Sequence, residues 1–292
     1  MRMQSLLKWS QSRVPLLFSV TLIQGILGLF CFYGHSTEQI EMMRQNSGSL
    51  HHVSLFNEVY SESLWLNRSQ SLATFASVKA GWRHAWNGVP GYLDSYLVSR
   101  FGWDSKTQSS ALTFRPVVVQ DNYVFLGWGV DWVDPLPGIR LTSQAGYSWD
   151  LSRQIHREGI DFRLGWQSYH EWKWSTRSEG WLARAQTELY TDGLYYQRYR
   201  NAISFAQVQN FVPVWTGESW RLGPVLSGAG AVDSAGLDYN RFVEVRAGMR
   251  LRWDAAGRSL IFYPHLIQGW RLGRPTALPN YQDLRVLLVI AW

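Results

Sequence analysis

Ser168 and His170 are the two residues of this sequence whose spacing most directly suggests a reaction. If the surrounding segment is a β-strand, side chains two positions apart lie on one face, so a serine nucleophile would have a histidine base beside it. No catalytic motif flanks the pair, and Trp172 and Trp174 on the same face favour a histidine among interfacial aromatic rings. We therefore predict that the protein is not an enzyme, and we keep a hydrolase as an alternative.

Metal and cofactor chemistry find no support in the residue spacing. His51, His52 and His265 are not spaced as metal-ligand motifs require. The sequence has no glycine-rich nucleotide loop, no phosphate loop and no run of basic residues. We predict that the protein uses no metal and no cofactor and binds no nucleic acid.

Charged, amide and aromatic residues that recur at every second position suggest binding instead. They could line a polar conduit, or they could pair with one another and fill it. The arginines favour a polar or anionic solute, and rings on the same face, such as Tyr169, suit stacking against sugars. The predicted lining residues are Arg140, Arg163, Gln167, Glu171, Lys173, Arg184, Glu188, Glu244, Arg246, Arg250 and Arg252.

Strict alternation indicates which elements would hold these side chains. In residues 159–175, Phe162, Leu164 and Trp166 alternate with polar residues such as Arg163 and Gln167. Successive side chains of a strand point to opposite faces, whereas a period of two would scatter apolar residues around a helix. The pattern therefore predicts β-strands with one apolar and one polar face.

Clusters of Gly, Pro, Asp, Asn and Ser divide the chain after Ser71 into twelve predicted strands. These are residues 71–86, 91–103, 111–120, 122–132, 138–149, 159–175, 180–191, 201–215, 219–232, 240–253, 259–272 and 282–292. The connections 150–158, 192–200, 233–239 and 273–281 are expected to be long, and 133–137, 176–179, 216–218 and 254–258 short. Long connections would then share one end of the sheet, although 87–90 and the region near 121 do not fit this rule.

Composition favours closure of these strands into an all-β, antiparallel transmembrane barrel. Charged residues make up only 17% of the chain, against about 25% in a typical soluble domain. Mean hydropathy is −0.20, as expected when apolar residues alternate with polar ones instead of forming spans of roughly 20. Tryptophans at strand ends suit a girdle at the membrane boundary, the alternative being a soluble core or sugar clefts. The predicted girdle is Trp86, Trp103, Trp132, Trp149, Trp174, Trp253 and Trp292.

The first 36 residues resemble a secretion signal in composition. Three basic residues precede the apolar run Val14–Tyr33, and small residues follow it, so we predict cleavage near Ser36, with an uncleaved anchor as the alternative. Removal of residues 1–36 would lower the formal net charge from +6 to +3 and discard the single cysteine, Cys31. Residues 37–70 are predicted to be a periplasmic segment, in which 55–66 could form a helix or an extra strand.

The final segment Gln282–Trp292 resembles the last strand of bacterial outer-membrane β-barrel proteins. It ends on an aromatic residue and carries apolar residues at every second position before it, here at 284, 286, 288 and 290. The resemblance implies insertion into the outer membrane of a Gram-negative bacterium, with the barrel assembly machinery as a partner that recognises Gln282–Trp292. Trp292 departs slightly from the phenylalanine more usual there.

The stretch Trp181–Trp253 is more loosely similar to barrels of exopolysaccharide-export and bacteriophage-adsorption proteins. The residues that carry this likeness are 207–211 and 238–241. It implies a porin-like channel or exporter, in contact with outer-membrane lipid and lipopolysaccharide, for a polar substrate such as a surface polysaccharide, with polysaccharide secretion partners. A closed structural or receptor barrel, for example for phage adsorption, is the main alternative.

Overall fold

The computed structural model describes residues 51–67, 71–104, 122–151, 158–174, 184–197, 200–235, 241–255, 257–272 and 280–291. Nearly all of them belong to β-strands. No helix in these ranges is long and apolar enough to cross a membrane. The predicted signal or anchor, residues 1–36, and the predicted strand 111–120 lie outside the described residues.

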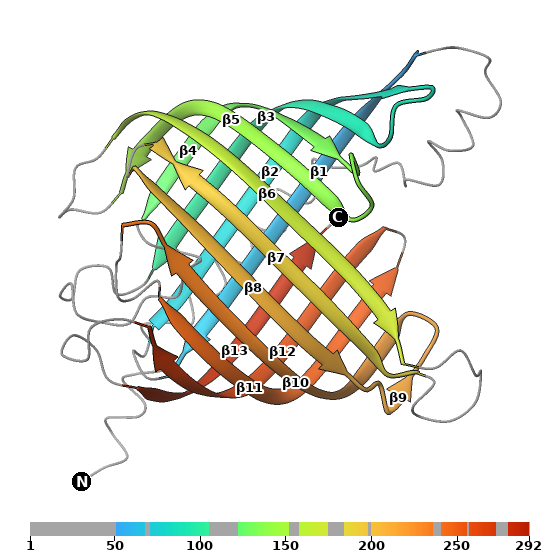
Figure 1. The fold of residues 1–292 in the computed structure, drawn as a ribbon, viewed down its shortest axis with the longest axis vertical. Coiled ribbons are helices and arrows are strands. Elements are labelled where there is room, and N and C mark those ends of the chain that lie inside the picture. The colour runs from blue at the N-terminus through green and yellow to red at the C-terminus, as the bar shows by residue number, and fades with distance from the viewer. Residues whose placement is uncertain are drawn as a thin grey trace, which may run out of the picture.

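Twelve long antiparallel strands form the wall, and a two-residue strand, β9, pairs with one end of β10. Neighbours in sequence are neighbours in the sheet, so the connectivity is a simple meander (Figure 1). The strands are β1 (His51–Leu66), β2 (Ser71–Trp86), β3 (Tyr92–Asp104), β4 (Tyr123–Val133), β5 (Ile139–Asp150), β6 (Gly159–Lys173), β7 (Gln186–Tyr196), β8 (Asn201–Phe211), β9 (Trp215–Thr216), β10 (Trp220–Asp233), β11 (Phe242–Ala255), β12 (Arg258–Arg271) and β13 (Tyr281–Ala291).

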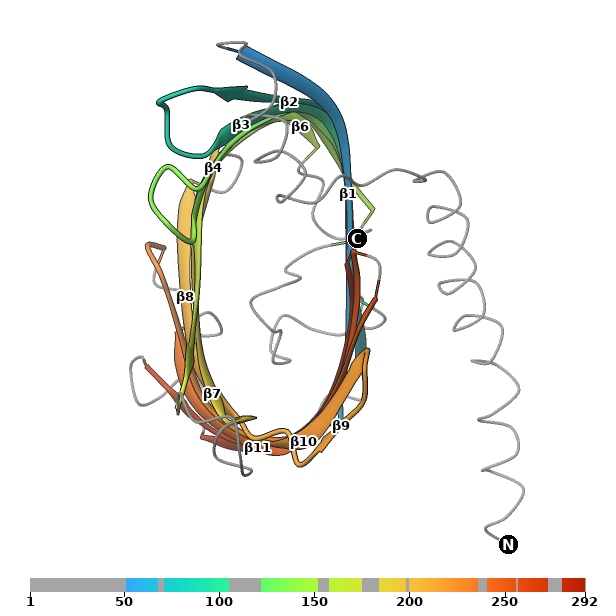
Figure 2. The same cartoon turned by 90° about the vertical axis from the view of Figure 1, so that its right-hand side faces the viewer.

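The sheet closes on itself because β13 pairs with β1. The seam runs from Tyr60 opposite Ala291 to Leu66 opposite Arg285. Seen from one end, the barrel is flattened, with β1 and β13 on one long wall and β7 and β8 on the other (Figure 2). A closed sheet has no free edge, so its backbone groups are hydrogen-bonded without help from water.

Alternation assigns one face of every strand to the lumen. In β6, Asp161 and Arg163 are buried inside, whereas Ile160 before them and Leu164 and Trp166 after them are exposed on the outer wall. The outer wall keeps this apolar character around the barrel, and its exposed residues include Trp82, Leu97, Leu126, Trp128, Tyr147, Val208, Leu226, Met249, Phe262 and Leu284. A water-soluble protein does not expose so continuous an apolar surface, so the barrel is of the transmembrane type.

The predicted all-β barrel of twelve strands is confirmed, but the barrel begins one strand earlier than predicted. Residues 51–66, assigned to the periplasmic segment, form β1 and make the closing seam with β13. Phe56, Val59 and Tyr60 there follow no simple apolar–polar alternation, because β1 turns Glu58 and Glu62 together with Phe56 and Leu64 into the lumen. Because β3 pairs directly with β4, the short turn 87–91 lies at the same end of the barrel as the short turn 134–138, which removes one exception to the length rule. The short connections 67–70 and 197–200, at the opposite end, are new exceptions.

The predicted strand 180–191 was placed too early, because the strand observed there, β7, is Gln186–Tyr196. β6 ends at Lys173 and β7 begins at Gln186, so the connection expected to be short spans 174–185, and the connection expected to be long spans only 197–200. Thr187, Leu189 and Thr191 face outward and carry a weak apolar signal, which is why the period misplaced this strand. Arg184 consequently precedes the strand.

If the outer wall faces lipid, a charge placed on it should destabilise the barrel. Leu97 lies in the middle of β3, with 69% of its surface exposed. We expect Leu97→Arg to lower the free energy of unfolding in lipid vesicles by about 2–4 kcal/mol, because a charge would face hydrocarbon. Val89→Arg, in the turn 87–91, is the matched control and should cost less than about 1 kcal/mol. Equal losses, measured by denaturant titration of the heat-modifiable gel band, would contradict a lipid-facing wall.

Candidate functional site in the lumen

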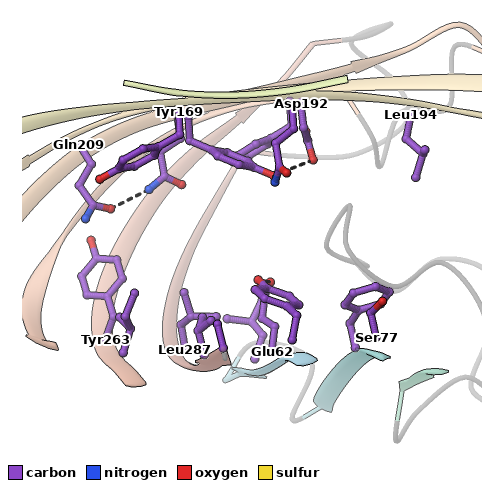
Figure 3. Close-up of a pocket in the computed structure, with 18 of the residues that line it drawn as sticks. Glu62, Ser77, Tyr169, Asp192, Leu194, Gln209, Tyr263 and Leu287 are labelled. Carbon is purple, nitrogen blue, oxygen red and sulfur yellow. Dashed lines mark hydrogen bonds between the residues drawn. The ribbon is translucent and has the colours of Figure 1, made fainter. Parts of the chain in front are cut away.

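A cavity of about 920 Å³ runs between the two long walls of the barrel. Residues from β1 and β2 and from β11 to β13 line one side, and residues from β5 to β8 line the other. Figure 3 shows Glu62, Leu287 and Tyr263 on one wall, with Tyr169, Asp192 and Gln209 facing them. The lumen is therefore hollow at its centre, and its lining mixes aromatic, amide and charged side chains.

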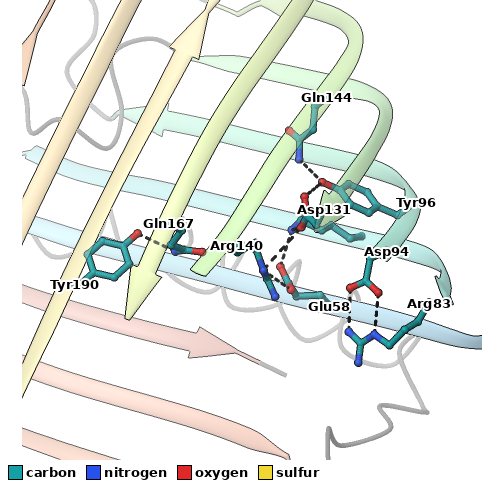
Figure 4. A network of polar contacts seen from close by, with 10 residues as sticks. Glu58, Arg83, Asp94, Tyr96, Asp131, Arg140, Gln144, Gln167 and Tyr190 are labelled. Atoms are coloured by element: carbon teal, nitrogen blue, oxygen red, sulfur yellow. Dashed lines mark hydrogen bonds and ion pairs between the residues drawn. The ribbon is translucent and has the colours of Figure 1, made fainter. Parts of the chain in front are cut away.

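A first ion-pair network crosses the lumen from β1 to β5. Arg140 donates to Glu58 at 2.9 Å, and Lys79 lies 3.0 Å from Glu58 and 2.7 Å from Asp131. The hydroxyl of Tyr96 donates to Asp131 at 2.5 Å (Figure 4). Because β1 and β5 are not neighbours in the sheet, the Arg140–Glu58 contact spans a chord of the barrel and narrows the lumen there.

Next to this network, one end of the flattened cross-section, which we call a lobe, is filled by side chains of β1, β3 and β4. Phe56, Tyr96, Val98 and Phe125 pack into a buried cluster, with the rings of Phe56 and Tyr96 edge to face at 6.0 Å. Gly129, directly opposite Tyr96 in the ladder, makes room for this ring, since a Cβ there would overlap it. These four side chains are absent from the lining of the cavity, so this packed end of the cross-section does not contribute to the slot, as we call the cavity between the two long walls.

A second network centres on Glu244 in β11. Its carboxylate accepts hydrogen bonds from Arg246 at 2.8 Å, from Arg285 at 2.8 and 3.2 Å, and from the hydroxyl of Tyr281. Arg246 also donates to Gln207 at 3.1 Å. Only 1% of Glu244 is exposed, so two guanidinium groups compensate one fully buried carboxylate.

Two further arginines are held between a carboxylate and an aromatic face. Arg250 donates to both oxygens of Glu188, at 2.6 and 2.7 Å, and its guanidinium lies 3.9 Å from the centre of the Phe211 ring. Arg163 donates to Asp161 at 2.8 Å, and its guanidinium lies 4.1 Å from the centre of the Phe125 ring. Cation–π contacts of this kind strengthen when the pair is desolvated.

Two carboxylates in the slot accept hydrogen bonds from tyrosine hydroxyls instead of from cations. The hydroxyl of Tyr60 donates to Glu62 at 2.7 Å on one wall, and that of Tyr190 donates to Asp192 at 3.1 Å on the other. Among the described residues, neither carboxylate forms an ion pair. The sequence prediction missed both: residues 55–66 were left open as a helix or an extra strand, and β7 was placed too early. The pattern Tyr-x-acid within a strand was the available signal.

The predicted lining residues divide into two groups. Arg140, Gln167, Glu188, Glu244, Arg246 and Arg250 border the cavity. Arg163 faces inward but is enclosed by its contacts. The remaining four do not border the cavity: Glu171 and Lys173 are exposed at the end of β6, Arg184 lies before β7 and reaches Thr216, and Arg252 pairs with Asp254 near the end of β11. Of the two arrangements left open by the sequence, Arg140, Arg163, Arg246 and Arg250 follow the paired one, because each has a carboxylate partner.

The predicted Ser168–His170 dyad is not formed in the described geometry. The hydroxyl of Ser168 is 2.9 Å from that of Thr191, and the ring of His170 stacks on Trp172. His51, His84 and Trp86 stack against one another on the outer wall, and the described residues contain no group of three or more side chains that could hold a metal ion. His265 lies buried against Tyr263.

Six of the predicted girdle tryptophans lie within three residues of a strand end. Trp86, Trp132, Trp174 and Trp253 are at the end of the barrel that also holds His51 and Ala291, and Trp103 and Trp149 are at the opposite end. Trp292 lies outside the described residues. The indoles of Trp132, Trp149, Trp174 and Trp253 are exposed on the outer wall, as a ring at a membrane boundary requires.

No family model matches the sequence, and no curated protein matches it at a significant level. Solved structures that are similar include the β domain of the Bordetella autotransporter BrkA, with 10% identity over 82% of this chain and 99% of that one, and a TM-score of 0.38. An outer membrane channel from Pseudomonas putida F1 has 12% identity over 84% and 98% of the two chains, with a TM-score of 0.39. The KdgM porin has 6% identity over 80% and 98%, with a TM-score of 0.34. Likenesses this distant do not identify what the lumen carries.

The buried ion pairs of Glu244 should contribute strongly to the free energy of unfolding. We expect Glu244→Gln to lower the free energy of unfolding by about 3–5 kcal/mol, because it leaves Arg246 and Arg285 buried without their shared carboxylate. Asp254→Asn, which removes a partly exposed partner of Arg252 and Arg221, is the matched control and should cost about 1 kcal/mol or less. Denaturant titration in detergent measures both, and equal costs would show that the buried network does not stabilise the barrel.

Proposed function

We propose that the protein is a passive channel in the outer membrane of a Gram-negative bacterium, and that it conducts a polar solute, namely the chain of a surface polysaccharide. The observation that supports this best is the cavity of about 920 Å³, which lies inside a closed barrel and is lined by polar and aromatic side chains. Transport through such a lumen requires positioned hydrogen-bonding groups and no cofactor.

The proposal extends to the chain's surroundings. Cleavage near Ser36 would release the mature chain to the periplasm, and Gln282–Trp292 would be recognised by the barrel assembly machinery. Lipid and lipopolysaccharide would cover the apolar outer wall, and a polysaccharide secretion apparatus would deliver the substrate. The end that holds His51 and Ala291 would then face the periplasm.

A closed structural or receptor barrel is the second candidate. The observation in its favour is the filling of both lobes: the Phe56 cluster lies in one, and a second buried cluster of Phe211, Val225 and Tyr263 lies in the other. Under this candidate the remaining slot would be too narrow for ions to pass freely. The two candidates therefore differ in conductance.

Single-channel recording in planar bilayers separates them. We expect the unmodified protein to conduct, and Arg140→Ala to raise the single-channel conductance, because it removes the contact with Glu58 that crosses the lumen while Lys79 still pairs with both carboxylates. Arg184→Ala, at the rim of the barrel, is the control and should leave the conductance unchanged.

A correctly folded barrel with no conductance would rule out the channel and support the closed barrel. If the protein conducts but Arg140→Ala behaves as Arg184→Ala does, the network does not limit the pore. Heat-modifiable migration on a gel establishes in each case that the inserted protein is a folded barrel.

A further inference from the structure

The two long walls of the slot each carry a tyrosine, a carboxylate and a phenylalanine in the same register. On β1 and β2, Tyr60 and Glu62 share a face, and Phe75 lies directly across the ladder from Glu62. On β7 and β8, Tyr190 and Asp192 share a face, and Phe205 lies directly across the ladder from Asp192. We call these the two Tyr–acid–Phe sets.

Each set has the same internal geometry. The tyrosine hydroxyl donates to the carboxylate two residues further along the strand, at 2.7 Å in one set and 3.1 Å in the other. The tyrosine ring lies beside the phenylalanine ring, with centres 6.0 Å apart for Tyr60 and Phe75 and 6.1 Å apart for Tyr190 and Phe205. Both pairs of rings are tilted by similar angles, 54° and 53°.

The two sets face each other across the cavity. All six side chains line it, and Glu62 and Asp192 point toward one another from opposite walls (Figure 3). They are close enough for Glu62 to interact electrostatically with Tyr190 and Asp192. A solute in the slot would thus meet two aromatic faces and two carboxylates arranged on its two sides.

We propose that the two Tyr–acid–Phe sets form a binding site for one uncharged sugar ring of a chain that occupies the slot, an inference that rests on the proposed channel function and names its substrate class. Aromatic rings bind the apolar C–H face of a pyranose, and each carboxylate accepts hydrogen bonds from its hydroxyl groups. Pockets that recognise small polar molecules combine apolar walls with a few oriented polar groups in this way.

Charge in the slot favours an uncharged ring over an acidic one. In the part of the chain that the structure describes, the hydrogen-bond partners of Glu62 and Asp192 are tyrosine hydroxyls, and neither carboxylate has a paired cation, so a carboxylate on the sugar would be repelled from both sides. Arg100 lies beside Phe75, and Arg246, which interacts electrostatically with Glu62, is already paired with Glu244. Of the polar or anionic solutes that the arginines of the sequence favoured, this site therefore suits the uncharged polar ones.

A buried tyrosine borders the same cavity. Tyr263 is 3% exposed, and its hydroxyl interacts with that of Ser227. It points across the slot toward Gln209 in Figure 3. A sugar hydroxyl between Tyr263 and the amide of Gln209 would form hydrogen bonds with both side chains.

The test is block of the single-channel current at about 0.1 M KCl, where charges within about 10 Å still interact. The probes are maltohexaose, which is uncharged, and a hyaluronan hexasaccharide, which carries carboxylates. We expect maltohexaose to block at concentrations at least about tenfold lower than the acidic probe, because the charge-assisted contacts and repulsion act in the same direction. Equal block by the two probes would overturn the proposal.

Two double variants test the residues. Phe75→Leu with Phe205→Leu keeps apolar bulk but removes the ring faces, and should weaken block by maltohexaose about tenfold. Glu62→Gln with Asp192→Asn keeps shape but removes charge, and should reduce the preference over the acidic probe about tenfold. Glu171→Gln is the matched control, since Glu171 accepts from Tyr169 in the same Tyr-x-acid geometry but lies exposed at the strand end. Unchanged block in either double variant, with the barrel heat-modifiable, would refute the assignment.

Titration calorimetry of maltohexaose into the protein in detergent separates this inference from the channel function. Conductance without block or binding would refute the sugar site and leave the channel intact. Binding that depends on Phe75 and Phe205 in a protein with no conductance would support the site and refute the channel.

Discussion

Pairing of β13 with β1 is the constraint on which the structure depends. Once the sheet is closed, each strand has a neighbour on both sides, and alternate side chains must face either lipid or the lumen. Leu97 and Trp128 on one face and Glu244 and Arg163 on the other are direct results. A charged group on the outer wall would be desolvated without compensation, so the polar residues of the chain gather inside.

Charges buried inside a narrow barrel need partners, and many of these partners lie on the same strand. Residues two apart on a strand share a face, and acid–base or Tyr–acid pairs recur at this spacing, as in Asp161–Arg163 and Glu244–Arg246. Each such pair is assembled as its own strand forms. Longer contacts, such as Arg140 to Glu58, then join strands that are not neighbours and brace the flattened cross-section. Glu62 and Asp192, which form no ion pair with any described residue, are found where the lumen is hollow.

The period of two was sufficient to predict most of the fold, because it reports directly which face is buried. It placed β2, β5 and β6 to within two residues and implied the inward direction of Arg140, Arg163 and Glu244. It failed at β1, where apolar Phe56 and Leu64 face the lumen alongside Glu58 and Glu62, and at β7, whose outer face is weakly apolar. Partners across the lumen, such as Glu58 for Arg140, depend on the flattened shape and on register, and neither can be obtained from one strand's pattern.

The seam has a further consequence for how the barrel assembles. Residues 60–66 and 285–291 are the paired segments most distant in sequence, so their meeting carries the largest loss of chain entropy and comes after the hairpins between them. Until then, β1 and β13 are exposed sheet edges, able to add a strand from another molecule. Removal of β1 or β13 would leave the sheet with permanently exposed edges. Both strands are therefore needed for a monomer that does not aggregate.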